Sequence, residues 1–345
     1  MKKALVTGGC GFIGSNLTKE LVKQGWQVDI VDDMSNGHLE LLEGINFRVL
    51  MNGSFYTAYK MQDLERQQDE VLVIQDDFSD DNILGAIHQG VYNVIFHQAA
   101  VPRVSYSVEE PWHTTDVNIS KTVRLFESAR GAVDRIVWAS SSSVYGGANE
   151  MPTKENTPKN PKSPYAWQKS AIEDFAKLAG DLYDLDIVCL RYFNVFGPGQ
   201  YGDSPYSTAV SAWCHAIKNS LECRSDGDGE QTRDMCYIDN TVHANILAAT
   251  ASKKFKGETY NIACGRRVSN NQVLEAIKER FGDKVKITHA PVRAGDVKHT
   301  LADYSKAKRD FGYEPLVYFW EGLEQTYSWW GLQDGRFNSL YRSNV

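Results

Sequence analysis

The sequence predicts an α/β protein, with a doubly wound parallel sheet followed by a smaller α/β domain. Two observations lead to this fold class. Short apolar runs rich in valine and isoleucine alternate with amphipathic helical stretches through the first half of the chain, as expected for strands buried between two helical layers. A glycine-rich turn follows directly on the first apolar run, which is typical of the first strand-to-helix crossover in such sheets.

Six runs are expected to form strands because they are apolar, β-branched and bounded by polar residues or glycine. In chain order they are Lys3–Val6, Gln27–Val31, Val71–Ile74, Val94–Phe96, Arg135–Ala139 and Ile187–Arg191. Four stretches between them carry apolar residues at helical spacing and are expected to form helices that cover the sheet. They are Ile13–Gln24, Ile83–Gln89, Val117–Arg130 and Pro164–Tyr183.

The domain organisation is inferred from where this alternation weakens. Residues 1–196 are expected to form the first domain, and residues 197–345 most of the second, where glycine, proline and aromatic residues become more frequent. Segments near 237–263 are expected to return to the first domain. The stretch Phe47–Glu70 has no clean period and is expected to be an insertion that is partly helical.

The composition excludes several classes of protein. The chain has 345 residues, 42% hydrophobic and 23% charged, and its net charge of −7 includes no basic block that would indicate nucleic-acid binding. No apolar run is long enough for a membrane span, and the apolar start is too short for a secretion signal. The six cysteines are scattered without CxxC spacing, so we expect free thiols in a reducing cytoplasm and no metal site.

The segment Gly8–Gly14 lies between the first expected strand and the first expected helix. Glycines there let the backbone turn tightly and approach a pyrophosphate, while the helix N-terminus offers unpaired N–H groups. Asp32 ends the second expected strand, eighteen residues after Gly14. A carboxylate at that place accepts hydrogen bonds from a ribose 2′-hydroxyl and repels a 2′-phosphate. A Rossmann-type site for NAD is therefore predicted, rather than one for NADP.

A serine run and a Tyr-x-x-x-Lys pair form a second candidate group. The run Ser140–Ser143 follows an expected strand, and Tyr165 and Lys169 lie four residues apart in the expected helix that begins at Pro164, which places them on one helical face. Free tyrosine has a pKa of about 10. A nearby ammonium and a positive nicotinamide ring are expected to lower that pKa towards neutral. These residue types predict a tyrosine base with a serine hydroxyl as proton relay.

Together these motifs resemble the extended short-chain dehydrogenase/reductase family and, within it, the nucleotide-sugar 4-epimerases. The resemblance runs from Lys3 to about Tyr327, with Phe47–Glu70 as the main departure. It implies that the catalytic residues are Ser141, Tyr165 and Lys169. It also implies a cofactor site made of Gly8, Gly11, Phe12, Ile13, Gly14, Asp32, Asp33, Ser35, Asn36, Gly37, Asp77, Phe78, Gln98, Ala99, Ala100, Asn118, Tyr165, Lys169 and Tyr192. His97, beside this site, is expected to be a hydrogen-bonded core histidine.

The residues after Ser141 separate the reactions of this family. Eliminating water across C5–C6 of the sugar needs an additional acid and base. The family's dehydratases supply an Asp-Glu pair directly after the catalytic residue, and its decarboxylases carry a glutamate nearby. Ser142 and Ser143 stand at these positions, which favours epimerisation at C4 through a transient 4-keto sugar. A 4,6-dehydratase, a decarboxylase, a reductase and a non-enzymatic NAD-binding regulator are the alternatives.

The resemblance further implies a nucleotide-sugar site. Its expected residues are Arg103, Ser141, Ser142, Ser143, Asn194, Arg233, Arg293, Asp296 and Thr300. Arg233 and Arg293 are assigned to the nucleotide phosphates, whose oxygens match the guanidinium fork, Asn194 to the diphosphate and Asp296 to the ribose.

The expected sugar depends on Thr300. Epimerases restricted to UDP-glucose and UDP-galactose can carry a tyrosine there, so a threonine predicts room for a 2-acetamido group. UDP-GlcNAc and UDP-GalNAc are the expected substrates, alongside UDP-Glc and UDP-Gal. By analogy with the family, a homodimer is expected through the helices Val117–Arg130 and Pro164–Tyr183.

Overall fold

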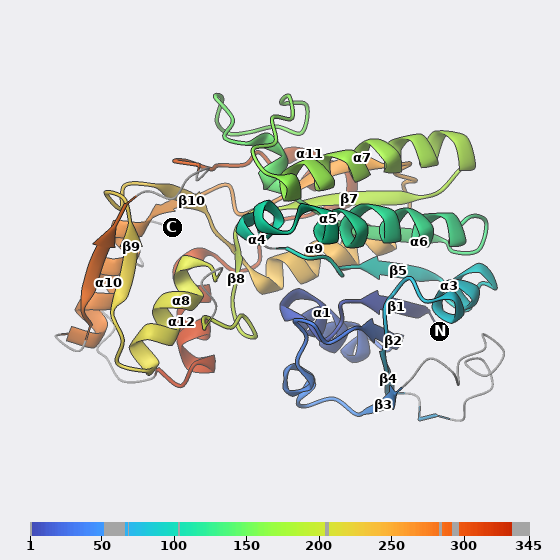
Figure 1. Ribbon diagram of the computed structural model, residues 1–345, viewed down its shortest axis with the longest axis horizontal. Coiled ribbons are helices and arrows are strands. Elements are labelled where there is room, and N and C mark those ends of the chain that lie inside the picture. The colour runs from blue at the N-terminus through green and yellow to red at the C-terminus, as the bar shows by residue number, and fades with distance from the viewer. Residues whose placement is uncertain are drawn as a thin grey trace.

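All six expected strands form, and they lie in one parallel sheet of eight strands with the order β12-β7-β6-β5-β1-β2-β4-β3 (Figure 1). The computed structural model describes residues 2–51, 66–67, 69–102, 104–203, 207–282, 285–291 and 297–332. The strands are β1 (Lys3–Thr7), β2 (Gln27–Asp32), β3 (Phe47–Met51), β4 (Val71–Gln75), β5 (Val94–His97), β6 (Arg135–Ser141), β7 (Ile187–Tyr192) and β12 (Glu258–Ile262). The strand order reverses between β1 and β5, where open α/β sheets bind their ligands.

Helices cover both faces of this sheet because alternate strand residues point to opposite sides. On one face Val6, Ile30 and Phe96 belong to a core with α1 (Phe12–Lys23) and α9 (Ile238–Thr250). On the other face, residues such as Leu5 and Trp138 pack with α3 (Asp81–His88), α6 (Thr122–Ser128) and α7 (Pro164–Tyr183). The predicted fold class, a doubly wound parallel α/β sheet, is confirmed.

The helix α7 has the expected bounds, and its first turn explains why. Ser163 precedes it, and the Ser163 Oγ accepts a hydrogen bond of 3.2 Å from the Ala166 nitrogen. Pro164 takes the first helical position, where its fixed φ and missing N–H suit the helix. The expected helix Val117–Arg130 is composite, because a π-helical turn (Asp116–Lys121) joins α5 (Pro111–Thr115) to α6, and α4 (Val104–Glu109) lies just before it.

The prediction that Phe47–Glu70 is an insertion is wrong for the first part of this stretch. Phe47–Met51 forms β3, which pairs in parallel with β4 as the edge strand of the sheet. This pairing satisfies backbone groups of a short segment whose side chains show no alternation. The expected partly helical part of this stretch lies mostly outside the described residues.

The second half of the chain adds to the sheet and also forms a separate group of elements. β12 pairs with β7 at one sheet edge, and α9 packs against α1. The separate group, at the left of Figure 1, contains α8 (Ala209–Lys218), β9 (Cys223–Asp226), β10 (Thr232–Asp234), α10 (Asn270–Phe281) and α12 (Phe319–Trp329). Smaller elements are β8 (Val195–Phe196), β11 (Cys236–Tyr237), β13 (Arg267–Ser269), β14 (Ile287–Ala290) and α11 (Ser305–Phe311).

The cysteines and helices bear on two further expectations. All six cysteines are buried as free thiols. In the part of the chain that the structure describes, no helix combines the length and apolarity needed to cross a bilayer.

Candidate active site

The glycine turn between β1 and α1 is packed too closely for side chains. A Cβ atom on Gly8 would lie 2.8 Å from the Ala99 nitrogen, and one on Gly14 would lie 2.1 Å from the Gly8 carbonyl oxygen. Gly8 also has a φ of +68°, which side chains rarely allow. After Gly11, α1 begins without a side-chain cap from any described residue and with no acidic residue in its first turn. Its positive dipole end is therefore available to an anionic group.

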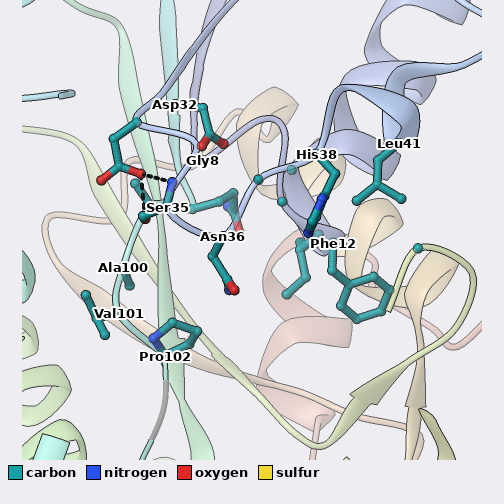
Figure 2. A pocket seen from close by; sticks show the side chains of 18 of the residues that line it. Gly8, Phe12, Asp32, Ser35, Asn36, His38, Leu41, Ala100, Val101 and Pro102 are labelled. Atoms are coloured by element: carbon teal, nitrogen blue, oxygen red, sulfur yellow. Dashed lines mark hydrogen bonds between the residues drawn. The ribbon is translucent and has the colours of Figure 1, made fainter. Parts of the chain in front are cut away.

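A pocket of about 420 Å³ opens at this turn. Figure 2 shows Asp32, Ser35 and Asn36 towards one side of it and Phe12, His38 and Leu41 towards the other. Most of the expected cofactor residues line this pocket: Gly8, Gly11, Phe12, Ile13, Gly14, Asp32, Asp33, Ser35, Asn36, Gly37, Phe78, Gln98, Ala99 and Ala100. Its volume and its position at the strand-order reversal suit a dinucleotide.

Asp32 is held firmly in the pocket wall. Its Oδ2 accepts a hydrogen bond of 2.9 Å from the Cys10 nitrogen, and its Oδ1 accepts one of 3.0 Å from the Met34 nitrogen. Burial raises the pKa of Asp32, while these two backbone hydrogen bonds act to lower it. The next residue, Asp33, accepts hydrogen bonds from the backbone nitrogen and the hydroxyl of Ser35. The loop after β2 is thus ordered by its own carboxylates.

Five of the expected cofactor residues, Asp77, Asn118, Tyr165, Lys169 and Tyr192, do not line this pocket. Asn118 instead bonds the backbone of Val101, a lining residue, through its Oδ1 at 2.8 Å and its Nδ2 at 3.2 Å. The Tyr192 hydroxyl donates to Gln98 Oε1 at 3.1 Å. Asp77 forms an ion pair of 2.5 Å with Lys121, whereas its neighbour Asp76 lines the pocket. Asn118 and Tyr192 therefore support the pocket wall through hydrogen bonds to its lining residues Val101 and Gln98.

The structure brings Ser141, Tyr165 and Lys169 together. Ser141 is the last residue of β6, and its side chain is hydrogen-bonded to the Tyr165 hydroxyl. Lys169 lies one turn further along α7, with its Nζ 5.8 Å from the centre of the Tyr165 ring. The Lys169 Nζ also donates a hydrogen bond of 2.7 Å to the Ala139 carbonyl oxygen of β6. One strand end and one helix therefore fix all three side chains.

Burial dominates the electrostatics of this cluster. It raises the pKa of Tyr165 to about 12, although the hydrogen bond from Ser141 acts in the opposite direction. Burial also lowers the pKa of Lys169 to about 7, against the charges of Glu173 and Cys189, which raise it. The expectation that the lysine brings the pKa of Tyr165 towards neutral is therefore not met in the protein alone. Loss of hydration disfavours the charged form of both side chains.

His97 is a core residue, as expected. Its Nδ1 lies 2.6 Å from Thr7 Oγ1 and its Nε2 lies 3.0 Å from Thr122 Oγ1. Burial, with a smaller contribution from Lys169, lowers the pKa of His97 to about 3. The ring is therefore neutral at physiological pH, and Thr7 in turn accepts a hydrogen bond from the Ala99 nitrogen. His97 thus supports the floor of the pocket.

A buried ion pair lies beside Ser141, Tyr165 and Lys169, the expected catalytic residues, which are called the catalytic cluster below. No sequence motif pointed to this ion pair. Arg191 of β7 donates to both carboxylate oxygens of Glu173, with its Nε and Nη2 each 2.7 Å from an oxygen. The Ser140 hydroxyl donates to the same carboxylate at 2.6 Å. Arg191 Nη1 also donates to the Tyr145 hydroxyl at 2.7 Å. Glu173 follows Lys169 by one helical turn, so only that spacing could have suggested the link.

Two of the expected substrate residues, Asn194 and Thr300, are in direct contact. Asn194 adopts a φ of +31°, and its Nδ2 donates to Thr300 Oγ1 and to the Asp234 carbonyl oxygen, both at 3.1 Å. Thr300 Oγ1 also accepts a hydrogen bond of 3.1 Å from the Asp234 nitrogen. Arg233, which precedes Asp234 in the chain, donates hydrogen bonds to the carbonyl oxygens of Thr232 and Lys298. The hydroxyl of Thr300 is therefore engaged within the protein.

Ser142 and Ser143 form a 3₁₀ turn that begins at the catalytic strand end. The Ser143 nitrogen donates to Ser141 Oγ at 3.2 Å. The Ser143 Oγ is buried and has no hydrogen-bond partner among the described residues. A substrate oxygen would satisfy such an atom. Three other expected substrate residues, Arg103, Arg293 and Asp296, lie outside the described residues.

The pocket also has lining that the sequence did not suggest. Tyr201, from the second half of the chain, lines it with its ring 4.7 Å from that of His38. Asn16 of α1 holds this segment through a hydrogen bond of 3.0 Å to the Pro198 carbonyl oxygen. The unexpected lining residues include His38, Leu41, Asp76, Val101, Pro102, Gln200 and Tyr201. His38 and Leu41 follow the acidic loop after β2, and Asp76, Val101 and Pro102 adjoin expected cofactor residues, whereas Gln200 and Tyr201 had no sequence signal.

The chain is similar to a large group of known proteins. Residues 5–326 match the model of a family described as GDP-mannose 4,6 dehydratase. A UDP-glucose 4-epimerase of Mycolicibacterium smegmatis is 33% identical over 328 residues, which cover 94% of this chain and 97% of that protein.

Solved structures show the same similarity. A UDP-N-acetylglucosamine 4-epimerase from Methanobrevibacter ruminantium, in complex with UDP-N-acetylmuramic acid, is 32% identical, with a TM-score of 0.83 and coverage of 96% of this chain and 99% of that one. The UDP-glucose 4-epimerase of Thermus thermophilus, in complex with NAD, is 28% identical, with a TM-score of 0.80 and coverage of 95% and 99%.

Proposed function

Because the chain belongs to the GDP-mannose 4,6-dehydratase family of extended short-chain dehydrogenases/reductases, we propose that it is an NAD-dependent 4-epimerase of a UDP-sugar. The observation that carries this proposal is the serine turn after Ser141. Dehydration needs a carboxylate acid and base near the sugar, and Ser142 and Ser143 offer only hydroxyls. The buried carboxylate of Glu173 is already bonded to Arg191, and the half-buried carboxylate of Glu155 to the Asn261 nitrogen.

The cofactor is NAD, and the residues of the pocket fit it. The α1 N-terminus, uncapped by any described side chain, and the close-packed glycine turn suit the pyrophosphate. Asp32, fixed by two backbone hydrogen bonds, suits an adenosine ribose with a free 2′-hydroxyl. A 2′-phosphate would meet the charge of this buried carboxylate. The pocket therefore favours NAD over NADP.

The catalytic cluster is proposed to move one proton. Tyr165 removes the proton of the C4 hydroxyl and later returns it, with Ser141 relaying between the substrate oxygen and the phenol. The chemistry that bound NAD supplies is reversible hydride acceptance at C4, through a transient 4-keto sugar, together with a formal positive charge on its ring. The buried ammonium of Lys169, anchored on the Ala139 carbonyl oxygen, favours the phenolate form of Tyr165.

The substrate class rests on the segment around Asn194. This side chain, held by Thr300 and Asp234, is proposed to contact the diphosphate. Arg233 and Arg293 are proposed to bind the phosphates, and Asp296 the ribose. A threonine at position 300 favours UDP-GlcNAc and UDP-GalNAc as substrates, with UDP-Glc and UDP-Gal also accepted.

A homodimer is proposed through the helical stretch Val117–Arg130 and α7, and exposed apolar side chains on α7 and on its neighbours α4 and α5 support it. Val108 is 63% exposed, Trp112 81% and Leu182 62%. Large apolar groups exposed to solvent favour burial against a second copy. Size-exclusion chromatography at micromolar concentration should give a dimer, and Trp112→Ser should shift it towards the monomer. A monomeric parent protein would contradict this assembly.

The experiment that tests the function uses purified protein without added NAD. It is incubated with UDP-GlcNAc and separately with UDP-glucose, and each reaction is followed by proton NMR. Appearance of the C4 epimer of either sugar supports the proposal, and the faster sugar tests the substrate assignment. If no epimer forms even after NAD is added, the proposal fails. A 4-keto-6-deoxy product would establish a dehydratase instead.

A further inference from the structure

Two buried arginine–carboxylate pairs lie at opposite ends of the neighbouring strands β6 and β7. Arg135, the first residue of β6, bonds Asp186 just before β7, with Nε and Nη2 at 3.0 and 2.6 Å from Asp186 Oδ2. Arg191, near the end of β7, bonds Glu173 of α7. All four side chains are at most 8% exposed. The pairs are alike in chemistry and burial, but only the Glu173 pair lies at the end that carries the catalytic cluster.

The Glu173 carboxylate bonds the strand that ends in Ser141. Ser140, the residue before Ser141, donates its hydroxyl to Glu173 Oε1 at 2.6 Å. Ser140 and Arg191 are also register partners across β6 and β7. Glu173 therefore connects the two strand ends with α7, the helix that supplies Tyr165. A shift of this carboxylate would move the serine relative to the tyrosine.

The same carboxylate supplies negative charge near Lys169. Both residues lie on α7 one turn apart, and Lys169 is 4% exposed. The charged and titratable groups that act on the Lys169 ammonium are Glu173 of α7 and Cys189 of β7, and His97 of β5 responds to it in turn. Burial lowers the pKa of Lys169, and Glu173 has the largest opposing effect. Loss of the Glu173 charge would therefore favour the neutral amine.

We propose that Glu173 is a positioning residue of the catalytic cluster: it fixes the strand end at Ser140 and keeps Lys169 in its ammonium form. The inference rests on the proposed function, because it takes Lys169 as the partner of the base Tyr165. Arg191 holds the carboxylate in place from β7, and Lys159, 3.7 Å from Glu173 Oε2, adds a second positive charge. The Arg135–Asp186 pair, at the other strand ends, has no such role.

The test compares four variants of the full-length protein: Glu173→Gln, Glu173→Asp, Ser140→Ala and the control Asp186→Asn. For each, kcat and KM for the preferred UDP-sugar are measured from about pH 5 to about pH 9, together with the melting temperature. Glu173→Gln and Asp186→Asn each leave a buried arginine without its counter-charge, so both should lower the melting temperature by several degrees. Stability alone therefore cannot separate them, and the pH profile can.

The profiles should separate the two pairs. Activity that needs the ammonium declines as pH rises through the pKa of Lys169. In Glu173→Gln this decline should occur at least about one pH unit lower than in the parent, with kcat reduced and KM little changed. Asp186→Asn should keep the parent profile and kcat. Glu173→Asp retains the charge and should keep the parent midpoint. Ser140→Ala should lower kcat about fivefold at an unchanged midpoint.

Several results would overturn the inference. It fails if Glu173→Gln and Asp186→Asn have the same pH profile, or if Glu173→Asp shifts the midpoint as far as Glu173→Gln. Should Glu173→Gln not fold, an unchanged kcat in Ser140→Ala or a shifted midpoint in Glu173→Asp would overturn it. These results require an active parent protein. An inactive parent would instead contradict the proposed function and the inference with it.

Discussion

The two parts of the candidate site are built differently. The catalytic cluster takes Ser141 from a strand end and Tyr165 and Lys169 from one helix face, all locked by the core of the sheet. The second part, called the substrate segment, consists of Asn194 and Thr300, which come from connections far apart in the chain. Asn194 Nδ2 donates a hydrogen bond to Thr300 Oγ1. Regular elements position groups more firmly than loops do. The first part should therefore determine whether the reaction occurs, and the second which sugar reacts.

The largest expected effect comes from the base. Tyr165→Phe removes the hydroxyl that is proposed to take the C4 proton, so kcat should fall by about 10³-fold or more on every UDP-sugar. The measurement is the epimerisation rate by NMR with each sugar. Tyr327→Phe is the matched control, because it removes a buried hydroxyl that has no hydrogen-bond partner in the described part of the chain. A Tyr165→Phe rate close to that of the control would contradict the assignment.

The pocket floor should respond to acid through His97. Its pKa is about 3 in the folded protein, against 6.5 for an unperturbed histidine, so the unfolded state binds the extra proton first. The stabilising contribution of neutral His97 is complete above about pH 6.5 and is lost as pH falls towards 3, to an extent on the order of 5 kcal/mol. Denaturant unfolding of the parent and of His97→Gln at several pH values measures this loss.

Asp234, which bonds Asn194 and Thr300, should have the opposite effect on the pH dependence of stability. It therefore provides a control for the His97 experiment. Burial raises the pKa of Asp234 to about 7, above its value in an unfolded chain. Its favourable contribution is therefore complete at low pH and is lost as pH rises through about 7. Asp234→Asn and His97→Gln should change the pH dependence of stability with opposite signs. If both variants changed the pH dependence of stability in the same direction, the predicted difference between the two regions would be wrong.

Asn194 should affect binding more than chemistry. Asn194→Asp keeps the shape and tolerates the positive φ, but it replaces a donor to Thr300 and Asp234 by a carboxylate next to the expected diphosphate. We expect KM to rise by about 10²-fold for every UDP-sugar while kcat changes much less. Initial rates over a range of substrate concentrations measure both. A fall in kcat with unchanged KM would place Asn194 with the catalytic cluster instead.

The smallest expected effect is the change of sugar preference at Thr300. Thr300→Tyr should remove activity on N-acetylated sugars selectively, by about tenfold relative to UDP-glucose. Since Thr300 Oγ1 bonds Asn194 and the Asp234 nitrogen, Thr300→Val is the matched variant that loses these bonds without adding bulk. Thr300→Val should lower both activities equally. Equal losses in Thr300→Tyr as well would mean that the hydroxyl matters and the size does not.

The sequence predicted those parts of the molecule that depend on local pattern. The glycine turn and the Tyr165–Lys169 spacing each lie within one short segment. The structure places the glycine turn after β1 and Tyr165 beside Ser141 at the carboxyl end of β6. β3 was missed because Phe47–Met51 shows no alternation, and its strand conformation depends on pairing with β4. Local propensity is weak evidence where the partner strand decides.

The parts that were not predicted depend on tertiary contacts. Glu173 and Arg191 are eighteen residues apart, and they meet only because α7 packs across β7. Tyr201 reaches the cofactor pocket from the second half of the chain. The pKa of Tyr165 was expected to approach neutral through a nearby ammonium and a positive nicotinamide ring, but in the protein alone burial raises it. Burial is a property of the whole fold, which no short motif reports.

In the proposed reaction the hydride leaves C4 and returns to C4 within the site. The most direct test is to supply the preferred UDP-sugar with deuterium at C4 and to locate the deuterium in the product by NMR and mass spectrometry. An epimerase predicts a C4 epimer that keeps its deuterium at C4 and takes up no hydrogen from solvent at that carbon. Deuterium found at C6 of a 4-keto product, or lost to solvent, would contradict the account.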